Sequence, residues 1–235
     1  MTPVSYVFAS CKEWHRPLYE ELVSDMPGQW TWVSTPHELS EVITYKSPRY
    51  VFFLHWNWLV PRAVWEQHEC VCFHMTDVPY GRGGSPLQNL IVAGHAVTKL
   101  TALRMVEEMD AGPVYIKRDL GLNGSAQDIY LRAGMLSVET IRWMIATEPT
   151  PSPQQGQAVV FRRRVPEQSR IPEDIDIDQL YDLIRMLDAD GYPHAFIDHG
   201  NFRLQFRAVH SSGDQLTAQV IINKLSGEAE NERGN

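Results

Sequence analysis

Residues 70–90 read CVCFHMTDVPYGRGGSPLQNL and join a short apolar run to a loop of unusual composition. The run CVCFH has the length and the apolar character of a buried strand, and it ends on His74. The following loop combines residues that restrict the backbone with residues that permit positive φ or a close approach, namely Pro79, Pro86, Gly81, Gly83 and Gly84. The pattern predicts a strand that ends at an imidazole and continues into a tightly built turn.

The segments around this stretch alternate between strand and helix patterns. Strands are predicted at 4–10, 30–34, 49–56 and 70–74, and helices at 13–23, 35–45 and 85–94. Thr35 and Glu38 have the spacing of a helix capping box. This alternation predicts an α/β fold, a Rossmann-like and mostly parallel sheet with helices on both faces. Ligands of such sheets bind beyond the carboxyl ends of the strands, where we expect His74 and the segment 55–61 to lie.

The second half of the chain changes in character. Two extended segments are predicted within 99–122, joined by a turn at Asp110, and a long amphipathic helix at 125–147. The proline-rich segment 148–157 has no apolar periodicity, and it precedes a helix at 176–193, a hairpin at 194–209 and a further strand at 216–222. We therefore expect a catalytic domain at 1–147, a linker and connecting strand at 148–165, a small C-terminal α+β domain (helix and β-hairpin) at 166–225, and a disordered tail at 226–235.

Composition and charge limit the classes of partner. The 235 residues are 43% hydrophobic and 21% charged, as in a globular protein, and the formal net charge of −8 disfavours binding to nucleic acid. FRRR at 161–164 is a basic cluster that fits either the phosphates of a small ligand or a solvated strand end. The apolar runs are too short for a bilayer and no secretion signal is evident, so we expect no membrane association. Three cysteines without CxxC spacing indicate a reduced, cytoplasmic compartment.

Residues 72–88 form a longer motif, C-x-H-x-T-x-x-P-x-x-R-G-x-x-P-x-Q. It resembles the signature loop of folate-dependent formyltransferases, N-x-H-x-S-x-L-P-x-x-R-G-x-x-P. The segment LRMVEEMDAG (103–112) is similar to the aspartate–glycine motif of that family, with Asp110 and Gly112 in the matching places. The resemblance covers roughly residues 50–145 well. Beyond the linker, FRRRVPEQSRI and YDLIRMLDADGYPHAFI look like the appendage of bacterial sugar N-formyltransferases.

The resemblance implies a transferase that moves a formyl group from 10-formyltetrahydrofolate, without a metal, to the free amine of a nucleotide-linked dideoxy-amino sugar. A UDP-4-amino-4,6-dideoxy sugar of a pseudaminic-acid-type pathway, in surface-glycan biosynthesis, is one example. Three alternatives stay open: a methionyl-tRNA formyltransferase, a 10-formyltetrahydrofolate hydrolase, and a non-catalytic folate or sugar-nucleotide binding protein. The acidic balance and the short C-terminal part weigh against tRNA. Apolar residues of that part offer a surface for a homodimer.

The chemistry explains the residues of the motif. An amine attacking a formyl carbon forms an oxyanion, which requires a hydrogen-bond donor, and releases a proton, which requires a group that titrates near neutrality. His74 is the expected acid/base and oxyanion partner, because histidine is the side chain that titrates in this range. An aspartate beside the imidazole would orient it and stabilise its protonated form, so Asp110 is the expected orienting residue.

Position 72 departs from the family motif, because Cys72 stands where the family has asparagine. A thiol is a weaker donor than an amide. Asn57 in the folate-side loop could supply the amide, charged His74 could act alone, or the chain could bind its ligands without transfer. Cys72 as a covalent nucleophile is a further reading, but a cysteine in such a strand is more often a small buried hydrophobe.

The resemblance also implies binding residues. The folate donor is expected against the apolar loop 55–60 and the aspartate–glycine motif (103–112). The residues expected there are Trp56, Trp58, Leu59, Met105, Met109 and Asp110. The acceptor is expected at Met75, Thr76, Asp77, Arg82, Gly83 and Gly84. Each has a structural alternative: one tryptophan could be plain core, and Arg82 could form an internal salt bridge with Asp77 or another carboxylate.

Overall fold

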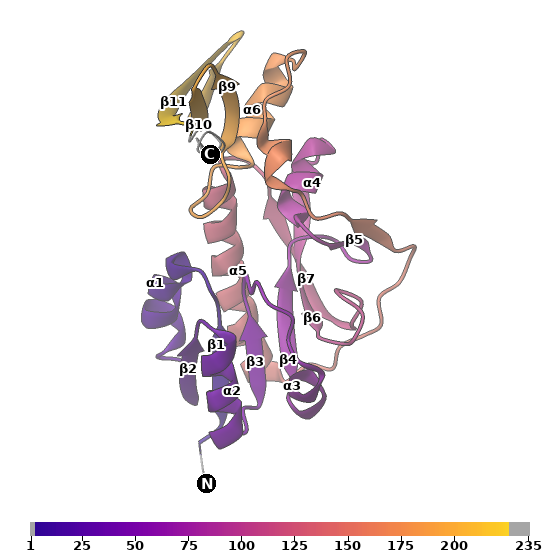
Figure 1. Cartoon of the computed structure of the whole chain (residues 1–235). Coiled ribbons are helices and arrows are strands. Elements are labelled where there is room, and N and C mark those ends of the chain that lie inside the picture. Colours follow the sequence, from indigo (N-terminus) through magenta and orange to yellow (C-terminus); the bar gives the residue numbers. More distant parts are fainter. Residues whose placement is uncertain (1–2, 226–235) are drawn as a thin grey trace, which may run out of the picture.

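The computed structural model describes residues 3–225, so the tail predicted at 226–235 lies outside the described part of the chain. A six-stranded sheet with strand order β2-β1-β3-β4-β6-β7 forms its centre. The strands are β1 (Ser5–Ala9), β2 (Gln29–Val33), β3 (Tyr50–Phe53), β4 (Cys70–His74), β6 (Val97–Arg104) and β7 (Val114–Gly121). Figure 1 shows the strands of this sheet side by side, with helices in front of them and behind them.

The first four strands of the sheet run parallel, and β6 and β7 run antiparallel to their neighbours. The mostly parallel α/β sheet predicted from the sequence is therefore confirmed. The carboxyl ends of β1, β3 and β4 meet at one edge, which brings Ser10, His55 and His74 to the same end of the molecule.

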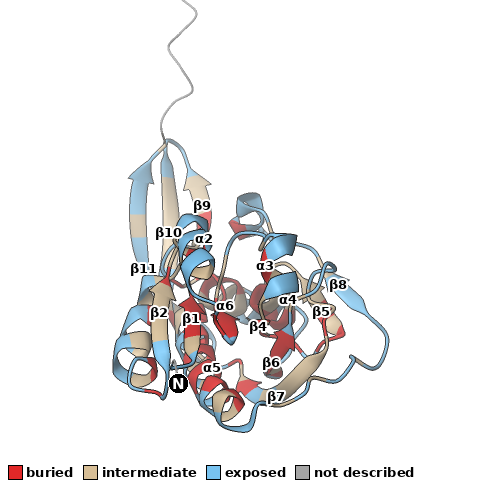
Figure 2. Cartoon of the chain, turned by 90° about the horizontal axis from the view of Figure 1, so that it is seen from below, coloured by how far each residue is buried: buried red, intermediate tan, exposed pale blue. Residues whose placement is uncertain are grey.

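Alternating side chains bury the two faces of the sheet. Tyr6 and Phe8 pack toward Val138 and Ile141 of α5 (Ala126–Thr147), which covers one face. Val7 and Ala9 pack on the opposite face, toward α2 (Pro36–Tyr45) and α3 (Arg62–Gln67). Successive residues of a strand point to opposite sides, so this pattern gives two core layers, visible in Figure 2 as buried strands between half-exposed helices.

The helical segments agree with the sequence in part. The capping box of Thr35 and Glu38 begins α2, and a second one, of Ser125 and Asp128, begins α5. The helix predicted at 13–23 is instead a 3-10 turn η1 (Glu13–His15), a short α1 (Arg16–Leu18) and a π-helical η2 (Tyr19–Val23). Pro17 has no backbone N–H, which helps to explain why a regular helix does not run through this segment.

The C-terminal part consists of η3 (Pro166–Ser169), α6 (Ile177–Arg185) and a three-stranded antiparallel sheet. Its strands are β9 (Ala195–His199), β10 (Phe202–Ser212) and β11 (Gln215–Lys224), so the hairpin and the further strand are confirmed, while the helix is shorter than predicted. Leu183 and Ile184 of α6 share one apolar cluster with α5 and with α4 (Pro86–Val92). The C-terminal part is thus packed on the catalytic part through a common core.

A small second pairing connects the linker to the motif loop. β8 (Val159–Phe161) runs parallel to β5 (Tyr80–Gly83) in a two-stranded sheet. β5 was not predicted, because a strand that contains two glycines carries no apolar alternation.

Candidate active site

His74 and Asp110 are adjacent at the carboxyl edge of the sheet. The Nδ1 atom of His74 lies 3.6 Å from Oδ2 of Asp110, and both side chains are nearly buried. The Nε2 atom of His74 lies 2.8 Å from the carbonyl oxygen of Gly81. A carbonyl oxygen only accepts, so Nε2 carries a hydrogen and Nδ1 is the nitrogen that can gain and lose a proton beside the carboxylate.

The two motifs meet through their backbones as well. The N–H of Gly83 donates to Oδ2 of Asp110 at 2.9 Å. Asp110 itself has a φ of 55°, a left-handed conformation that aspartate tolerates better than most residues. Gly112 lies so close to β6 that a Cβ would stand 1.7 Å from the carbonyl oxygen of Arg104. The turn therefore depends on glycine at position 112 to aim the carboxylate.

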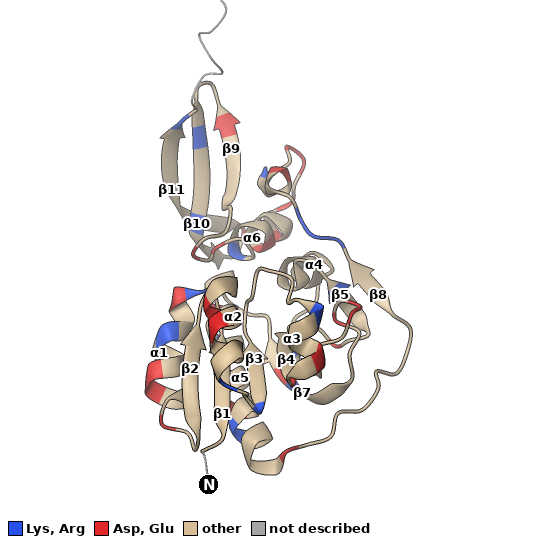
Figure 3. Cartoon of the chain, turned by 60° about the horizontal axis from the view of Figure 1, so that its bottom comes forward, with Lys and Arg blue, Asp and Glu red and all other residues tan. Residues whose placement is uncertain are grey.

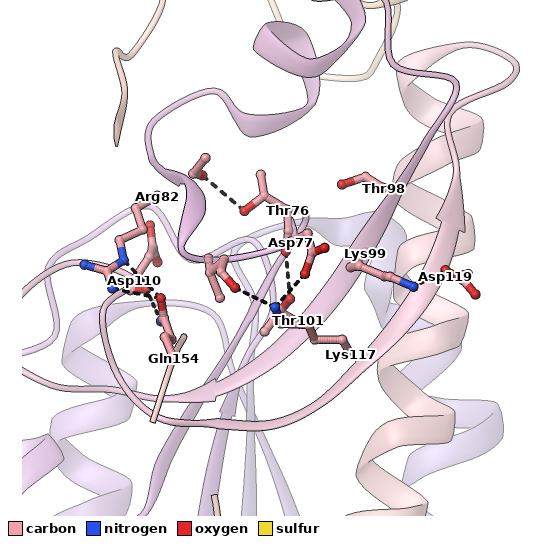
Figure 4. A network of polar contacts seen from close by, with 12 residues as sticks. Thr76, Asp77, Arg82, Thr98, Lys99, Thr101, Asp110, Lys117, Asp119 and Gln154 are labelled. Carbon is pink, nitrogen blue, oxygen red and sulfur yellow. Dashed lines mark hydrogen bonds and ion pairs between the residues drawn. The ribbon is translucent and has the colours of Figure 1, made fainter. Parts of the chain in front are cut away.

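Arg82 is held by side chains rather than left free for a ligand. Its guanidinium donates to Oε1 of Gln154 at 3.1 and 2.9 Å and lies 3.1 Å from Glu108. Gln154 in turn donates to the carbonyl oxygens of Asp110 and Gly112 at 2.7 and 2.8 Å, as Figure 4 shows in part. The internal ion pair weighed for Arg82 is thus present, with Glu108 and not with Asp77.

Two residues expected at the acceptor, Thr76 and Met75, are buried. Thr76 has no exposed surface, and its hydroxyl lies 3.2 Å from the carbonyl oxygen of Gly81, to which it donates. Met75 is 6% exposed and belongs to the apolar cluster of α4 and α5. Both side chains shape the loop from inside. Asp77 is exposed, and it forms an ion pair with Lys117 of β7 at 2.5 Å.

The glycines of the loop have neighbours from the linker. A Cβ at Gly83 would stand 2.6 Å from the carbonyl oxygen of Phe161, and one at Gly84 would stand 2.6 Å from Cβ of Arg163. These glycines therefore admit the linker segment, where the sequence had suggested the approach of a ligand.

Cys72 is a partly buried residue whose thiol lies near the carboxylate of Asp110. Burial, followed by the negative charge of Asp110, raises its pKa far above the ordinary value. Such a thiol stays protonated and is a poor nucleophile, so the covalent reading loses its support. Its strand neighbours place it at the rim of the apolar layer with Trp56 and Met105.

The loop after β3 exposes apolar side chains. Trp58 is 45% exposed and Leu59 is 82% exposed, and the ring of Trp58 packs edge-on against Trp56 at 5.1 Å. Met109, beside the catalytic turn, is 56% exposed. Exposed apolar groups beside a polar pair fit a flat, partly apolar ligand such as the folate ring system. Asn57 is exposed, and no hydrogen bond joins its side chain to His74 or to another described residue.

Two residues that organise the site were missed by sequence reasoning. Gln154 lies in the proline-rich linker and Lys117 in the middle of β7, and neither position carries a sequence signal. Both are recognisable only after the linker folds back on the loop.

Charged residues are distributed over much of the surface, with a basic run at 162–164 just after β8 (Figure 3). Among residues 3–225, no helix is long and apolar enough to cross a bilayer. The same residues contain no group of three or more histidine, cysteine, aspartate or glutamate side chains arranged to hold a metal ion.

Comparison with known proteins points to one family. Residues 166–223 match the family described as methionyl-tRNA formyltransferase, C-terminal domain. A methionyl-tRNA formyltransferase of Sorangium cellulosum is 30% identical over 168 residues, which is 67% of this chain and 53% of that protein. The chain spans about half the length of the curated relatives it matches.

The solved structures extend the similarity to the whole fold. A structure named methionyl-tRNA formyltransferase from Clostridium thermocellum is 39% identical with a TM-score of 0.89, and the match covers 94% of this chain and 99% of that one. HypX from Aquifex aeolicus with tetrahydrofolic acid (16% identity, TM-score 0.69, 89% of this chain and 39% of that one) has a similar fold. So does a likely sugar N-formyltransferase from Mycobacterium tuberculosis (16%, TM-score 0.71, 90% and 100%).

The 39% identical relative is covered almost completely, and formyltransferases of this kind take their one-carbon unit from 10-formyltetrahydrofolate. The chain therefore belongs to the folate-dependent formyltransferase family.

Proposed function

We propose that this protein transfers the formyl group of 10-formyltetrahydrofolate to a primary amine. The observation that carries the proposal is the pair His74 and Asp110, 3.6 Å apart, at the carboxyl end of β4. Formyl transfer to nitrogen needs a general acid/base to move the proton of the amine, and a carboxylate beside it stabilises its charged form. Exposed apolar side chains nearby can bind the donor.

The proton inventory of the reaction assigns a role to each member of the pair. The amine nitrogen bonds to the formyl carbon, the bond from that carbon to N10 of the folate breaks, and the proton of the amine ends on the departing N10. His74 Nδ1 takes this proton and returns it. While it is charged, the carboxylate of Asp110 stabilises it by opposite charge. The positive charge of protonated His74 also lies beside the developing oxyanion. It compensates for the amide of the family asparagine, which Cys72 replaces.

The donor is expected along the exposed apolar loop. Trp58 and Leu59, with Met109 on the other side, would contact the folate ring system. Asp110 would contribute to this contact through its backbone. Trp56 and Met105 lie deeper, in the apolar layer beneath, so they would support the loop from below.

The activity is tested with the purified full chain, 10-formyltetrahydrofolate and a broad panel of primary amines, followed by mass spectrometry for a product heavier by one formyl group. Formate is measured in parallel without an acceptor. Formylated product supports the proposal. Formate release alone would favour a hydrolase, and folate binding without either product would favour a binding protein.

Methionyl-tRNA is the first candidate acceptor. It is supported by the names of the 39% identical structure and of the curated relatives, and by the matched C-terminal family. Length does not speak against it, because the chain covers 99% of that structure.

The amine of a nucleotide-linked sugar is the second candidate. It is favoured by the net charge of −8, since a protein that binds a polynucleotide usually neutralises phosphates over a broad basic surface. Many arginines here are already paired with carboxylates, among them Arg82, Arg170 and Arg203. The basic run at 162–164 has the size to meet a diphosphate.

The two acceptors are distinguished in one competition. Charged initiator tRNA and a mixture of amino-sugar nucleotides are offered together, at low and at moderate salt. Formyl-methionyl-tRNA with a steep loss of rate at higher salt supports the first acceptor. A formylated sugar nucleotide with a shallow salt dependence supports the second.

A further inference from the structure

Two imidazoles with a buried Nε2 atom lie beneath the carboxyl edge, separate from His74 and Asp110. His15 ends η1 in the loop after β1, and His55 is the second residue after β3. Their ring centroids are 5.1 Å apart. The two histidines thus connect the loop after β1 with the apolar loop 55–61.

The hydroxyl of Ser10 contacts His15. Ser10 Oγ accepts from the backbone N–H of Lys12 at 3.2 Å and lies 2.7 Å from Nδ1 of His15. In the tautomer in which the hydroxyl donates to Nδ1, the hydrogen of the neutral ring is on Nε2, and Nε2 is a donor.

One ring nitrogen of each histidine has no hydrogen-bond partner among the described residues. Nε2 of His15 and Nε2 of His55 are buried and make no hydrogen bond to any described residue. Both residues line one cavity of about 10 Å³, together with Ser137 of α5 and apolar side chains of β4 and β6. This volume holds about one water molecule, and a buried water needs two to four polar neighbours.

We infer that one buried water molecule, held between His15 and His55, fastens the loop after β1 to the loop that receives the formyl donor. The water accepts from Nε2–H of His15 and donates to Nε2 of His55, with Ser137 Oγ on its remaining side. His15 and His55 are then positioning residues for the donor. The role in donor binding rests on the proposed function, whereas the water site does not.

The neighbourhood supports such a fastening. His55 has a φ of 48°, a conformation that non-glycine residues adopt only when their surroundings enforce it. Cys11 Sγ donates to the carbonyl oxygen of His55 at 2.8 Å, and Leu54 N–H donates to Ala9 at 2.9 Å. The water would complete the contact between these loops on the side that faces α5.

Acid should release the water site. The titratable groups around the rings are Lys12 and Cys11 on the loop after β1, Tyr130 on α5, and Tyr192 beyond it. Burial, with the charge of Lys12, lowers the pKa of His15 to about 4, and burial also lowers the pKa of His55 well below its usual value. Both rings are neutral at pH 7. A protonated His55 would turn its acceptor into a donor and lose the water.

The test measures binding of 5-formyltetrahydrofolate, a donor analogue, to the full chain by calorimetry between pH 4 and pH 8. The variants are His55→Gln, His15→Gln and, as a control, His37→Gln at an exposed position. We expect His55→Gln to weaken binding about tenfold at pH 7.5, the loss typical of one buried hydrogen bond. In the wild type, binding should stay constant between pH 8 and pH 6 and weaken as the pH approaches 4, where His15 gains its proton, while kcat at saturating donor changes less than KM.

A second variant guards against misfolding. Ser137→Val places a methyl group into the cavity and displaces the water without altering either imidazole, and it should weaken donor binding in the same direction. Two results would overturn the inference. One is a donor affinity in folded His55→Gln and Ser137→Val proteins that equals that of the wild type. The other is a crystal structure whose cavity holds no ordered water. Formyl transfer could still occur in that case. Conversely, histidine-dependent binding without any formylated product would contradict only the proposed function.

Discussion

Gly83 donates its backbone N–H to the carboxylate of Asp110 at 2.9 Å, across 27 positions of the chain. This bond joins the glycine-rich loop to the turn before β7, and it leaves the carboxylate aimed at His74. The geometry of the acid/base pair is therefore a property of two turns held together, and the predictions below address these turns and their surroundings.

His74→Asn should lower kcat by about 10²–10⁴-fold, the usual contribution of a positioned acid/base. Asparagine can still donate to the carbonyl oxygen of Gly81, so the loop should fold. Turnover at saturating donor and amine is measured beside the melting temperature. Near-normal turnover in a folded variant would remove His74 from the chemistry.

Asp110→Asn tests the charge alone. An amide oxygen can still accept from Gly83, and asparagine tolerates the left-handed backbone at this position. We expect kcat to fall by roughly 10²-fold or more, with donor affinity almost unchanged. Glu108→Gln is the matched control, since it removes an exposed carboxylate two residues away and should have little effect.

Cys72 gives a prediction on reactivity and one on rate. Its raised pKa predicts that iodoacetamide at neutral pH modifies Cys72 slowly and that Cys72→Ala retains activity. Cys72→Asn restores the amide of the family motif and should increase kcat if the oxyanion lacks a donor. Rapid inactivation by the alkylating agent, prevented in Cys72→Ala, would contradict the assignment of this thiol as structural.

Gly112→Ala should destabilise the fold by more than about 3 kcal/mol, because its Cβ would overlap the carbonyl oxygen of Arg104. Gly213→Ala is the control: it adds a Cβ with no atom within 4 Å, although the φ of 60° there carries a modest strain. Urea unfolding of both variants gives the two free energies. If the free energy of unfolding falls no more in Gly112→Ala than in Gly213→Ala, the backbone of β6 can shift to accommodate the added Cβ, and the prediction is wrong.

Stability should fall on acidification because of His15. Its pKa is about 4 in the fold and near 6.5 when unfolded, so the unfolded chain binds the proton first. The contribution is complete above pH 6.5 and is lost as the pH falls from 6.5 to 4, by about 3 kcal/mol. Urea unfolding at pH 7 and pH 4.5 should show a smaller decline for His15→Gln than for the wild type, and an unchanged one for exposed His37→Gln.

The sequence predicted the central sheet well because its strands are apolar and its helices carry local signals. β4 coincides with the run 70–74, and the caps at Thr35 and Ser125 mark the starts of α2 and α5. The irregular segment 13–23 was predicted as one helix, since periodicity does not distinguish 3-10, α and π turns. Boundaries set by tertiary packing, such as the end of α6, were also placed wrongly.

The proximity of His74 and Asp110 was predictable, whereas the contacts that support the pair were not. His74 and Asp110 stand in motifs, and the structure brings them together. Whether a loop side chain faces inward depends on contacts made later in the chain, so Thr76 was assigned to the ligand although it is buried, and Gln154 was passed over. The remaining folate and acceptor residues stay predictions.

Because β8 pairs with β5, the glycine-rich loop after β4 is built from two distant parts of the chain. A polypeptide cut after residue 157 would keep His74 and Asp110. It would lose β8 and the residues that follow it, against which Gly83 and Gly84 pack. A change in the segment that forms β8 would therefore alter the backbone of the loop that carries Gly83, whose N–H holds the carboxylate of Asp110.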